Sequence, residues 1–221
     1  MSPAHATFAH VRTWVFDLDN TLYPASVDLF GQIRPRMRDW LMQRFGIDAA
    51  AAAAMRQDYW NRYGTTLAGL VAEHRIDPLE FLAYSHDIDF SGLTPDPALA
   101  RTIAGLPGRR VVFTNGDSAY AARVLAARGL GDTFDMVYGA EHAGFASKPT
   151  PDAFARVFAR EGLVPDASAM FEDDARNLVV PHGLGLRTVL VGSEEPAPQI
   201  DDHTDDLTGF LAPHTRHEPS A

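Results

Sequence analysis

Two aspartates, Asp17 and Asp19, are the residues whose types and spacing most directly suggest chemistry. They are separated by one residue and directly follow a strand-forming run at positions 11–16. An aspartate carboxylate can attack phosphorus as a nucleophile, and a second carboxylate can give a proton to a leaving oxygen and take one from water. An exposed acidic turn is the alternative interpretation of an Asp-x-Asp pattern. The strand-forming run before the pair and Thr21 after it favour the catalytic interpretation.

A second polar group, Thr114-Asn115-Gly116, comes directly after the apolar residues 111–113. A hydroxyl and backbone N–H groups at a strand-to-helix turn can bind phosphate, although a plain turn before a helix N-cap has the same sequence. Lys148 stands beside a proline-rich turn and next to a helix start. Its ammonium could neutralise a phosphoryl group and the attacking carboxylate, and the alternative is an ordinary surface lysine.

A third polar group, Glu172-Asp173-Asp174, follows the apolar residues 169–171. Three consecutive acids repel one another unless a cation lies among them. The alternative is an acidic surface loop, but an apolar strand that runs straight into three acids is less typical of one. Hard oxygen ligands without histidine or cysteine favour Mg²⁺ over zinc, so we expect Mg²⁺ as the cofactor.

The elements that must position these groups are strands alternating with helices of about ten residues. This pattern predicts an α/β fold with a Rossmann-like parallel sheet that is covered on both faces. Because ligands of such sheets bind outside the carboxyl ends of the strands, the polar groups should meet in one crevice. The expected strands are residues 11–16, 110–113, 134–138, 169–171 and 187–191, and the expected helices are residues 118–128, 151–161 and 175–182.

Residues 25–94 differ from the rest because they have helical periodicity and no convincing strand run. We therefore predict an all-helical cap subdomain over residues 25–94, inserted after the first strand, and a catalytic core made of residues 1–24 and 95–221. The polar tail should contain one weak element at residues 206–211, and residues 214–221 should be disordered.

The composition limits the classes of partner. The chain has 221 residues and no cysteine, which excludes disulfides and thiolate zinc sites. Its formal net charge of −10 disfavours binding to nucleic acid and to anionic membranes. There is no run of 18 apolar residues and no secretory pattern at the start, so no membrane partner and a cytoplasmic location are expected. A small phosphorylated metabolite is the expected partner, since a local pocket can oppose the global charge.

Taken together, the polar groups resemble the motifs of the haloacid dehalogenase-like hydrolase superfamily. The four motifs stand here as FDLDNT, FTNGD, KPTPDAF and FEDDARNL, and the resemblance covers about residues 11–22 and 109–192. The resemblance implies that Asp17 is the nucleophile and forms a phospho-aspartate. It also implies that Asp19 is the general acid and base and that Lys148 balances charge.

The same resemblance implies a set of binding residues. Thr114, with the backbone around Asn115 and Gly116, would hold the phosphoryl oxygens. The magnesium ligands would be Asp17, the backbone carbonyl of Asp19, and Asp173. Some relatives use a Glu-Asp pair in the fourth motif and others an Asp-Asp pair, so either Glu172 or Asp174 could join Asp173.

Asp19 bears on the type of reaction, because relatives that displace halide from carbon work without metal and lack an acid at this position. Phosphate ester hydrolysis is therefore favoured.

The cap and DNTLYP look like the pyrimidine 5'-nucleotidase group, which implies a pyrimidine nucleoside 5'-monophosphate such as UMP or CMP as substrate. The alternatives are a phosphatase for another small metabolite, such as a sugar phosphate or phosphoglycolate, and a non-catalytic regulator on the same fold. In the cap, the side chains available for recognition are Tyr63, Thr65, Thr66 and His74.

Overall fold

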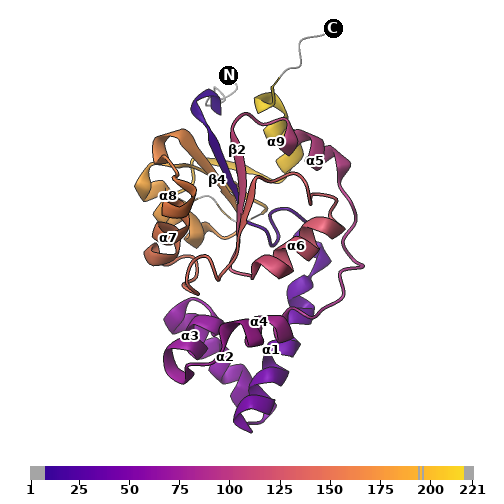
Figure 1. Cartoon of the computed structure of the whole chain (residues 1–221), viewed down its shortest axis with the longest axis vertical. Helices are drawn as coiled ribbons and strands as arrows, with labels where there is room; N and C mark the ends of the chain where they lie inside the picture. Colours follow the sequence, from indigo (N-terminus) through magenta and orange to yellow (C-terminus); the bar gives the residue numbers. More distant parts are fainter. Residues whose placement is uncertain (1–7, 194, 196, 217–221) are drawn as a thin grey trace.

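The fold is built around one six-stranded parallel sheet. The computed structural model describes residues 8–193, 195 and 197–216. The strand order is β3-β2-β1-β4-β5-β6, and all neighbouring strands are parallel (Figure 1). The predicted Rossmann-like α/β sheet is therefore confirmed. The strands are β1 (Thr13–Phe16), β2 (Arg109–Phe113), β3 (Met136–Tyr138), β4 (Ser168–Glu172), β5 (Arg187–Val191) and β6 (Asp202–Thr204).

Helices cover both faces of the sheet, and the side-chain alternation of the strands explains why (Figure 1). In β1, Trp14 and Phe16 pack into the hydrophobic cluster on one face, while Val15 packs into the cluster on the other. The first face is covered by α5, α6 and α9, and the second by α7 and α8. These helices are α5 (Pro97–Ala104), α6 (Ser118–Ala127), α7 (Pro151–Glu161), α8 (Val179–Leu184) and α9 (Leu207–Leu211).

Four further helices lie between β1 and β2 in the chain and form a separate body at the carboxyl ends of the strands (Figure 1). We call them the helical insertion: α1 (Leu29–Phe45), α2 (Ala49–Tyr63), α3 (Thr66–His74) and α4 (Pro78–Ser85). They have their own hydrophobic cluster, which includes Trp40, Leu70 and Phe81. This arrangement supports a cap at residues 25–94, and we keep those boundaries as a proposal.

The helix limits agree with the expected ones except at the fourth motif. The expected single helix at residues 175–182 is wrong, because Ala175–Leu178 is a 3₁₀ turn that leads into α8. Gly183 lies inside α8, and the helix ends instead at Gly185, which has the left-handed φ of +99°. A glycine ends a helix only where its backbone adopts a left-handed φ. The sequence alone does not show which of two nearby glycines adopts that conformation.

The tail is more ordered than expected. α9 matches the weak element predicted there, with Asp206 as its N-cap. β6 was missed, because a three-residue polar edge strand has no apolar alternation to reveal it. His214 was expected to be disordered, but it lies in a 3₁₀ turn with its ring 4.6 Å from that of Phe8. The expected disorder of residues 217–221 lies outside the described residues.

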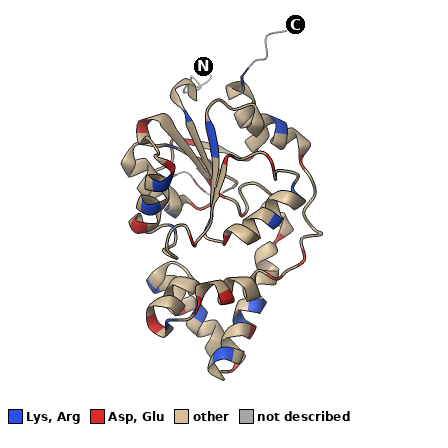
Figure 2. Ribbon diagram, viewed as in Figure 1, with Lys and Arg blue, Asp and Glu red and all other residues tan. Residues whose placement is uncertain are grey.

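Charged residues of both signs are interspersed over the helices of the core and of the insertion (Figure 2). None of the helices in the described part of the chain combines the length and the apolar character needed to cross a bilayer.

The contact between α2 and α3 gives a stability prediction. A Cβ atom at Gly69 would lie 2.3 Å from Cγ of Tyr59, so Gly69→Ala should destabilise the protein by about 1–3 kcal/mol. Gly183→Ala is the matched control, since it also lies in a helix and a Cβ there would meet nothing within 4 Å. The control should be neutral or stabilise by up to about 1 kcal/mol. Thermal unfolding would measure both, and equal effects would contradict the close packing at Gly69.

Candidate active site

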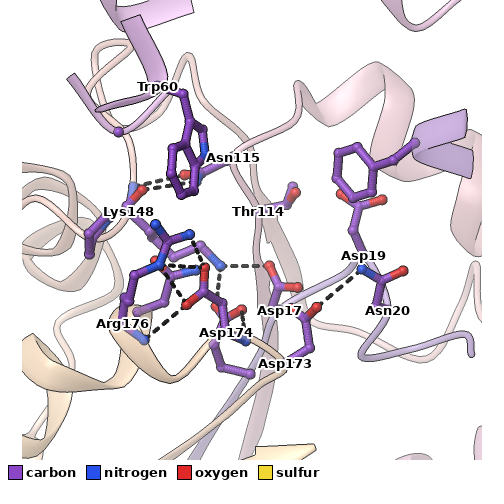
Figure 3. Close-up of a pocket in the computed structure, with 15 residues that line it drawn as sticks. Asp17, Asp19, Asn20, Trp60, Thr114, Asn115, Lys148, Asp173, Asp174 and Arg176 are labelled. Atoms are coloured by element: carbon purple, nitrogen blue, oxygen red, sulfur yellow. Dashed lines mark hydrogen bonds and ion pairs between the residues drawn. The ribbon is translucent and has the colours of Figure 1, made fainter. Parts of the chain in front are cut away.

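The site is centred on the ammonium group of Lys148, which is buried between two carboxylates (Figure 3). Its Nζ lies 2.6 Å from Oδ1 of Asp17 and 2.6 Å from Oε2 of Glu172, and it also donates to the carbonyl of Phe113 at 3.0 Å. The strand order explains this meeting. β1 lies between β2 and β4, so Asp17 emerges beside the ends of both neighbours.

Burial controls the charge states of Lys148 and the two carboxylates that surround it. Burial, and next the nearby Glu172, raise the pKa of Asp17 to about 8, although Lys148 acts in the opposite direction. Burial likewise raises the pKa of Glu172 to about 7. Burial alone would lower the pKa of Lys148, but the two carboxylates raise it above its usual value. Lys148 is therefore charged, and one ammonium serves two carboxylates.

Asp173 completes an acidic cluster next to Lys148. One carboxylate oxygen each from Asp17, Glu172 and Asp173 lie within 4.8 Å of one another, and Asn20 fixes Asp173 with a 3.1 Å hydrogen bond to Oδ2. Burial and the charge of Asp17 raise the pKa of Asp173 to about 6. Asp17 and Glu172 are buried and Asp173 is half-buried, so three carboxylates around one ammonium lack positive charge, and all offer hard oxygen ligands. The donor set therefore fits a divalent cation such as Mg²⁺.

The choice between Glu172 and Asp174 as the neighbour of Asp173 has a structural answer. Among the described residues, Glu172 belongs to the acidic cluster. Asp174 instead forms an ion pair with Arg176 at 2.5 Å and caps the turn at Ala175. We therefore favour Glu172, which also binds Lys148.

The predicted phosphate-binding residues Thr114, Asn115 and Gly116 all lie in the turn after β2, but their hydrogen bonds differ. Thr114 is buried, and its hydroxyl accepts a hydrogen bond from the N–H of Gly116 at 3.0 Å. The side chain of Asn115 bonds the backbone of Lys148 in both directions, at 2.8 and 3.1 Å. Asn115 therefore holds the lysine loop against β2.

Asp19 is held on the other side of Asp17 from Lys148 (Figure 3). Its Oδ1 accepts hydrogen bonds from the hydroxyls of Tyr23 at 2.5 Å and Tyr120 at 2.6 Å. Burial and the charge of Asp19 raise the pKa of both phenols well above the usual value, so both are protonated donors. Tyr23 entered the sequence-based predictions only as part of DNTLYP, without a role at Asp19. Tyr120 was missed, because nothing in the local pattern links it to a residue 101 positions away.

A cavity of about 210 Å³ brings most of the predicted site residues together. We call it the carboxylate cavity. Asp17, Asp19, Thr114, Lys148 and Asp173 all line it, together with Asn115. Gly116 does not.

A second, smaller cavity of about 110 Å³ lies under the helical insertion, and we call it the insertion cavity. It shares Asp19, Phe30 and Asn115 with the carboxylate cavity. Its other lining residues are largely apolar and come mainly from the insertion: Ile33, Met37, Thr65, Thr66, Leu67, Phe81, Leu82, His86 and Gly116.

Of the insertion side chains expected to recognise a ligand, only some face a cavity. Thr65 and Thr66 line the insertion cavity. Tyr63 and His74 belong to a network between α2 and α3, where Tyr63 bonds Glu73 at 2.8 Å and His74 bonds Tyr59 at 2.6 Å.

Two residues that the sequence analysis missed, Trp60 and Arg176, line the carboxylate cavity and meet across the gap between insertion and core (Figure 3). The guanidinium carbon of Arg176 lies 4.5 Å from the ring centroid of Trp60. An amphipathic pattern cannot reveal such a contact, since it joins residues from separate bodies.

A parallel sheet with carboxylates and a lysine at its carboxyl edge, below a helical insertion, is the arrangement of a hydrolase of the resembled class. The haloacid dehalogenase-like hydrolase family matches residues 11–179, and the chain belongs to that family. It is therefore a hydrolase.

The chain is similar to two curated proteins whose names differ in kind. Phosphate metabolism protein 8 of Saccharomyces cerevisiae is 27% identical over 180 residues, which are 74% of this chain and 56% of the yeast protein. An (S)-2-haloacid dehalogenase of Xanthobacter autotrophicus is 27% identical over 166 residues, which are 73% of this chain and 62% of that protein. The chain thus matches less than two thirds of either relative.

Solved structures have the same fold. A 2-haloacid dehalogenase from Pseudomonas syringae pv. Tomato DC3000 superposes with a TM-score of 0.58 at 20% identity, covering 92% of this chain and 99% of the other. At this identity the likeness concerns the fold alone.

The raised carboxylate pKa values predict how a divalent cation affects stability. The folded protein holds protons on Asp17, Glu172 and Asp173 up to about pH 8, 7 and 6, whereas the unfolded chain loses them near pH 4. The contribution of these groups to stability therefore falls as pH rises from about 4 to 8. Mg²⁺ bound to these carboxylates would replace the protons, so it should raise the Tm more at pH 8 than at pH 5.5.

At about 100 times its Kd, Mg²⁺ should stabilise by about 2.7 kcal/mol, or about 5–10 °C in Tm for a chain of this size. Asp173→Asn should lose most of this shift, and Asp174→Asn should retain it. Scanning fluorimetry with and without Mg²⁺ measures the effect. The reverse result for the two variants would move the ligand role to Asp174.

Proposed function

We propose that the chain is a magnesium-dependent phosphatase that hydrolyses a small phosphate monoester through a phospho-aspartate at Asp17. The observation that carries this proposal is the position of Asp17, whose carboxylate lies 2.6 Å from the Lys148 ammonium and within the acidic cluster. A reaction between an anionic nucleophile and a phosphoryl dianion needs concentrated positive charge, and the site is arranged to hold it.

Magnesium would be held by the carboxylates of Asp17 and Asp173 and the backbone carbonyl of Asp19, with Glu172 beside them. When bound, the cation would offset the repulsion between the nucleophile and the phosphoryl oxygens. Asp17 attacks phosphorus, and the leaving oxygen takes a proton from Asp19. Asp19 then accepts a proton from the water that hydrolyses the phospho-aspartate.

The remaining residues bind and orient the phosphoryl group. The hydroxyl of Thr114 and the backbone N–H of Asn115 donate hydrogen bonds to the phosphoryl oxygens. The N–H of Gly116 instead bonds the Thr114 hydroxyl, and Gly116 lies outside the carboxylate cavity. Lys148 balances charge on the nucleophile before and after the attack. Because the core residues of this cavity serve the phosphoryl group, the leaving group must lie toward the helical insertion, which contributes Trp60 to the carboxylate cavity and most of the lining of the insertion cavity.

The proposed substrate is a pyrimidine nucleoside 5'-monophosphate such as UMP or CMP. The similarity of the insertion and DNTLYP to the pyrimidine 5'-nucleotidase group supports this choice.

Other activities have weaker support. A phosphatase for a sugar phosphate or phosphoglycolate would use the same core chemistry. Similarity to a haloacid dehalogenase favours halide displacement, but halide is a weak base and needs no acid at the place of Asp19. A non-catalytic regulator would have no reason to keep Asp17, Asp19, Lys148 and Asp173 around one cavity.

Asp17→Asn should abolish phosphate release while the protein stays folded, since an amide is nearly isosteric with the carboxylate but a poor nucleophile. The expected loss in kcat is several orders of magnitude, about 10⁴-fold or more. The exposed Asp132→Asn is the matched control and should keep full activity. Phosphate release and thermal unfolding are measured for both. More than a few per cent of activity in Asp17→Asn would remove Asp17 from the nucleophile role.

Pyrimidine monophosphates should be hydrolysed with a higher kcat/KM than purine ones. Trp60→Ala, at the mouth of the carboxylate cavity, should change the UMP to AMP ratio more than it changes turnover of p-nitrophenyl phosphate. Leu79→Ala, an exposed insertion residue that lines neither cavity, is the control. Equal efficiency on UMP, AMP and a sugar phosphate would refute the nucleotidase assignment. Chloride release from 2-chloropropionate without phosphate release from any ester would refute the phosphatase.

A further inference from the structure

Two buried tyrosines converge on Asp19 from different parts of the chain. Tyr23 lies in the segment that leaves β1 for the helical insertion, and Tyr120 lies in α6 of the core. Their side chains are 2% and 1% exposed. Both hydroxyls donate to the same carboxylate oxygen, Oδ1 of Asp19, at 2.5 and 2.6 Å.

Two donors on one oxygen restrict how the carboxylate can turn. A single hydrogen bond would allow the group to rotate about its bond to Cβ, whereas two donors from fixed positions define the plane of the carboxylate. No described residue donates a hydrogen bond to Oδ2. Asp19 lines both cavities, and the two tyrosine hydroxyls occupy its Oδ1, so Oδ2 is the oxygen left for a leaving group between them.

Tyr120 is itself held firmly. Its ring stacks on that of His86 with centroids 4.2 Å apart, and the imidazole of His86 bonds Asp117 at 2.8 Å. Asp117 also accepts the N–H of Tyr120 at 2.7 Å and so caps the helix that carries it. A Cβ at Gly116 would lie 2.8 Å from the Tyr120 ring, so only glycine fits beside it.

His86 connects Tyr120 and Asp117 to the insertion, because His86 directly follows α4 where the chain returns to the core. The outgoing segment supplies Tyr23 and the returning segment supplies His86. Both chain crossings therefore contact the tyrosine pair that holds Asp19.

We propose that Tyr23 and Tyr120 are positioning residues that aim Oδ2 of Asp19 at the leaving-group oxygen. This inference rests on the proposed phosphatase function. In the first step the Asp17–phosphorus bond forms, the bond from phosphorus to the leaving oxygen breaks, and that oxygen takes the proton of Asp19. In the second step water adds to phosphorus and gives a proton to Asp19, and the bond to Asp17 breaks to release phosphate.

The test uses leaving groups that differ in their need for a proton. p-Nitrophenolate leaves readily without one, while phenolate and alkoxides need it more. Tyr120→Phe and Tyr23→Phe should lower kcat/KM for phenyl phosphate and for an alkyl phosphate about 10–100-fold more than for p-nitrophenyl phosphate. Tyr138→Phe removes another buried hydroxyl, which bonds Glu161 at 2.8 Å, and should leave this ratio unchanged.

A double-mutant cycle provides the second readout. With Asp19→Asn already in place, Tyr120→Phe should have little further effect on the ratio, because the group that it positions is gone. If one tyrosine variant fails to fold, the other carries the same expectation. Equal losses on all esters in folded variants would mean that the hydroxyls are only structural, and would overturn the inference. If the unaltered protein releases no phosphate from any ester, the proposed function itself fails.

Discussion

The ion triad of Asp17, Lys148 and Glu172 is the interaction on which the rest of the site depends. Burying an ammonium is costly unless carboxylates and further hydrogen bonds surround it, and Lys148 has all of these within 3.0 Å. Its partners come from β1, the end of β2 and β4, so three adjacent strands must be in register for the triad to form. The same triad leaves the acidic cluster short of positive charge. A divalent cation bound there would supply the missing charge.

The helical insertion adds the second constraint. It leaves the core after β1 and returns before β2, so both of its connections lie at the edge of the sheet where the site is. Contacts between the two bodies are both polar and apolar. His86 bonds Asp117, Trp60 meets Arg176, and Thr65 bonds Ser147 at 3.4 Å. Leu29 and Ile33 of α1 also pack into the hydrophobic cluster of the core, and Ala140 of the core packs into that of the insertion. The proposed role as a cap is consistent with an interface of this kind.

Much of the core could be predicted from sequence because its signals are local. Three of the four motifs directly follow a short strand, and parallel strands deliver their carboxyl ends to one edge, so Asp17, Thr114 and Asp173 could be expected together. Lys148 lies before α7, and its place beside them came from the resemblance of the third motif. The tyrosine pair could not be predicted in this way. Tyr120 reaches Asp19 across 101 residues, and only the packing of α6 on the sheet brings them together.

Features that depend on backbone conformation or on contacts between distant residues also explain the other differences between the predicted and the observed structure. β6 is a polar edge strand, and Gly185 ends α8 through a backbone angle that Gly183 does not adopt. In the insertion, sequence could suggest which helices are amphipathic but could not show which face meets the core. Tyr63 and His74 therefore looked available although they bond within the insertion, and Trp60 was overlooked.

The geometry around Asp19 also bears on which bond this hydrolase breaks. An alkoxide leaving group is a strong base and needs a proton, whereas a halide is a weak base and does not. Two buried phenols that bond one carboxylate next to Asp17 support the proposed reaction, in which that carboxylate would move a proton. The acidic cluster points the same way, because a cation next to Asp17 helps an attack on a phosphoryl dianion. Both features have a use in breaking a phosphorus–oxygen bond, and neither has an evident one in breaking a carbon–halogen bond.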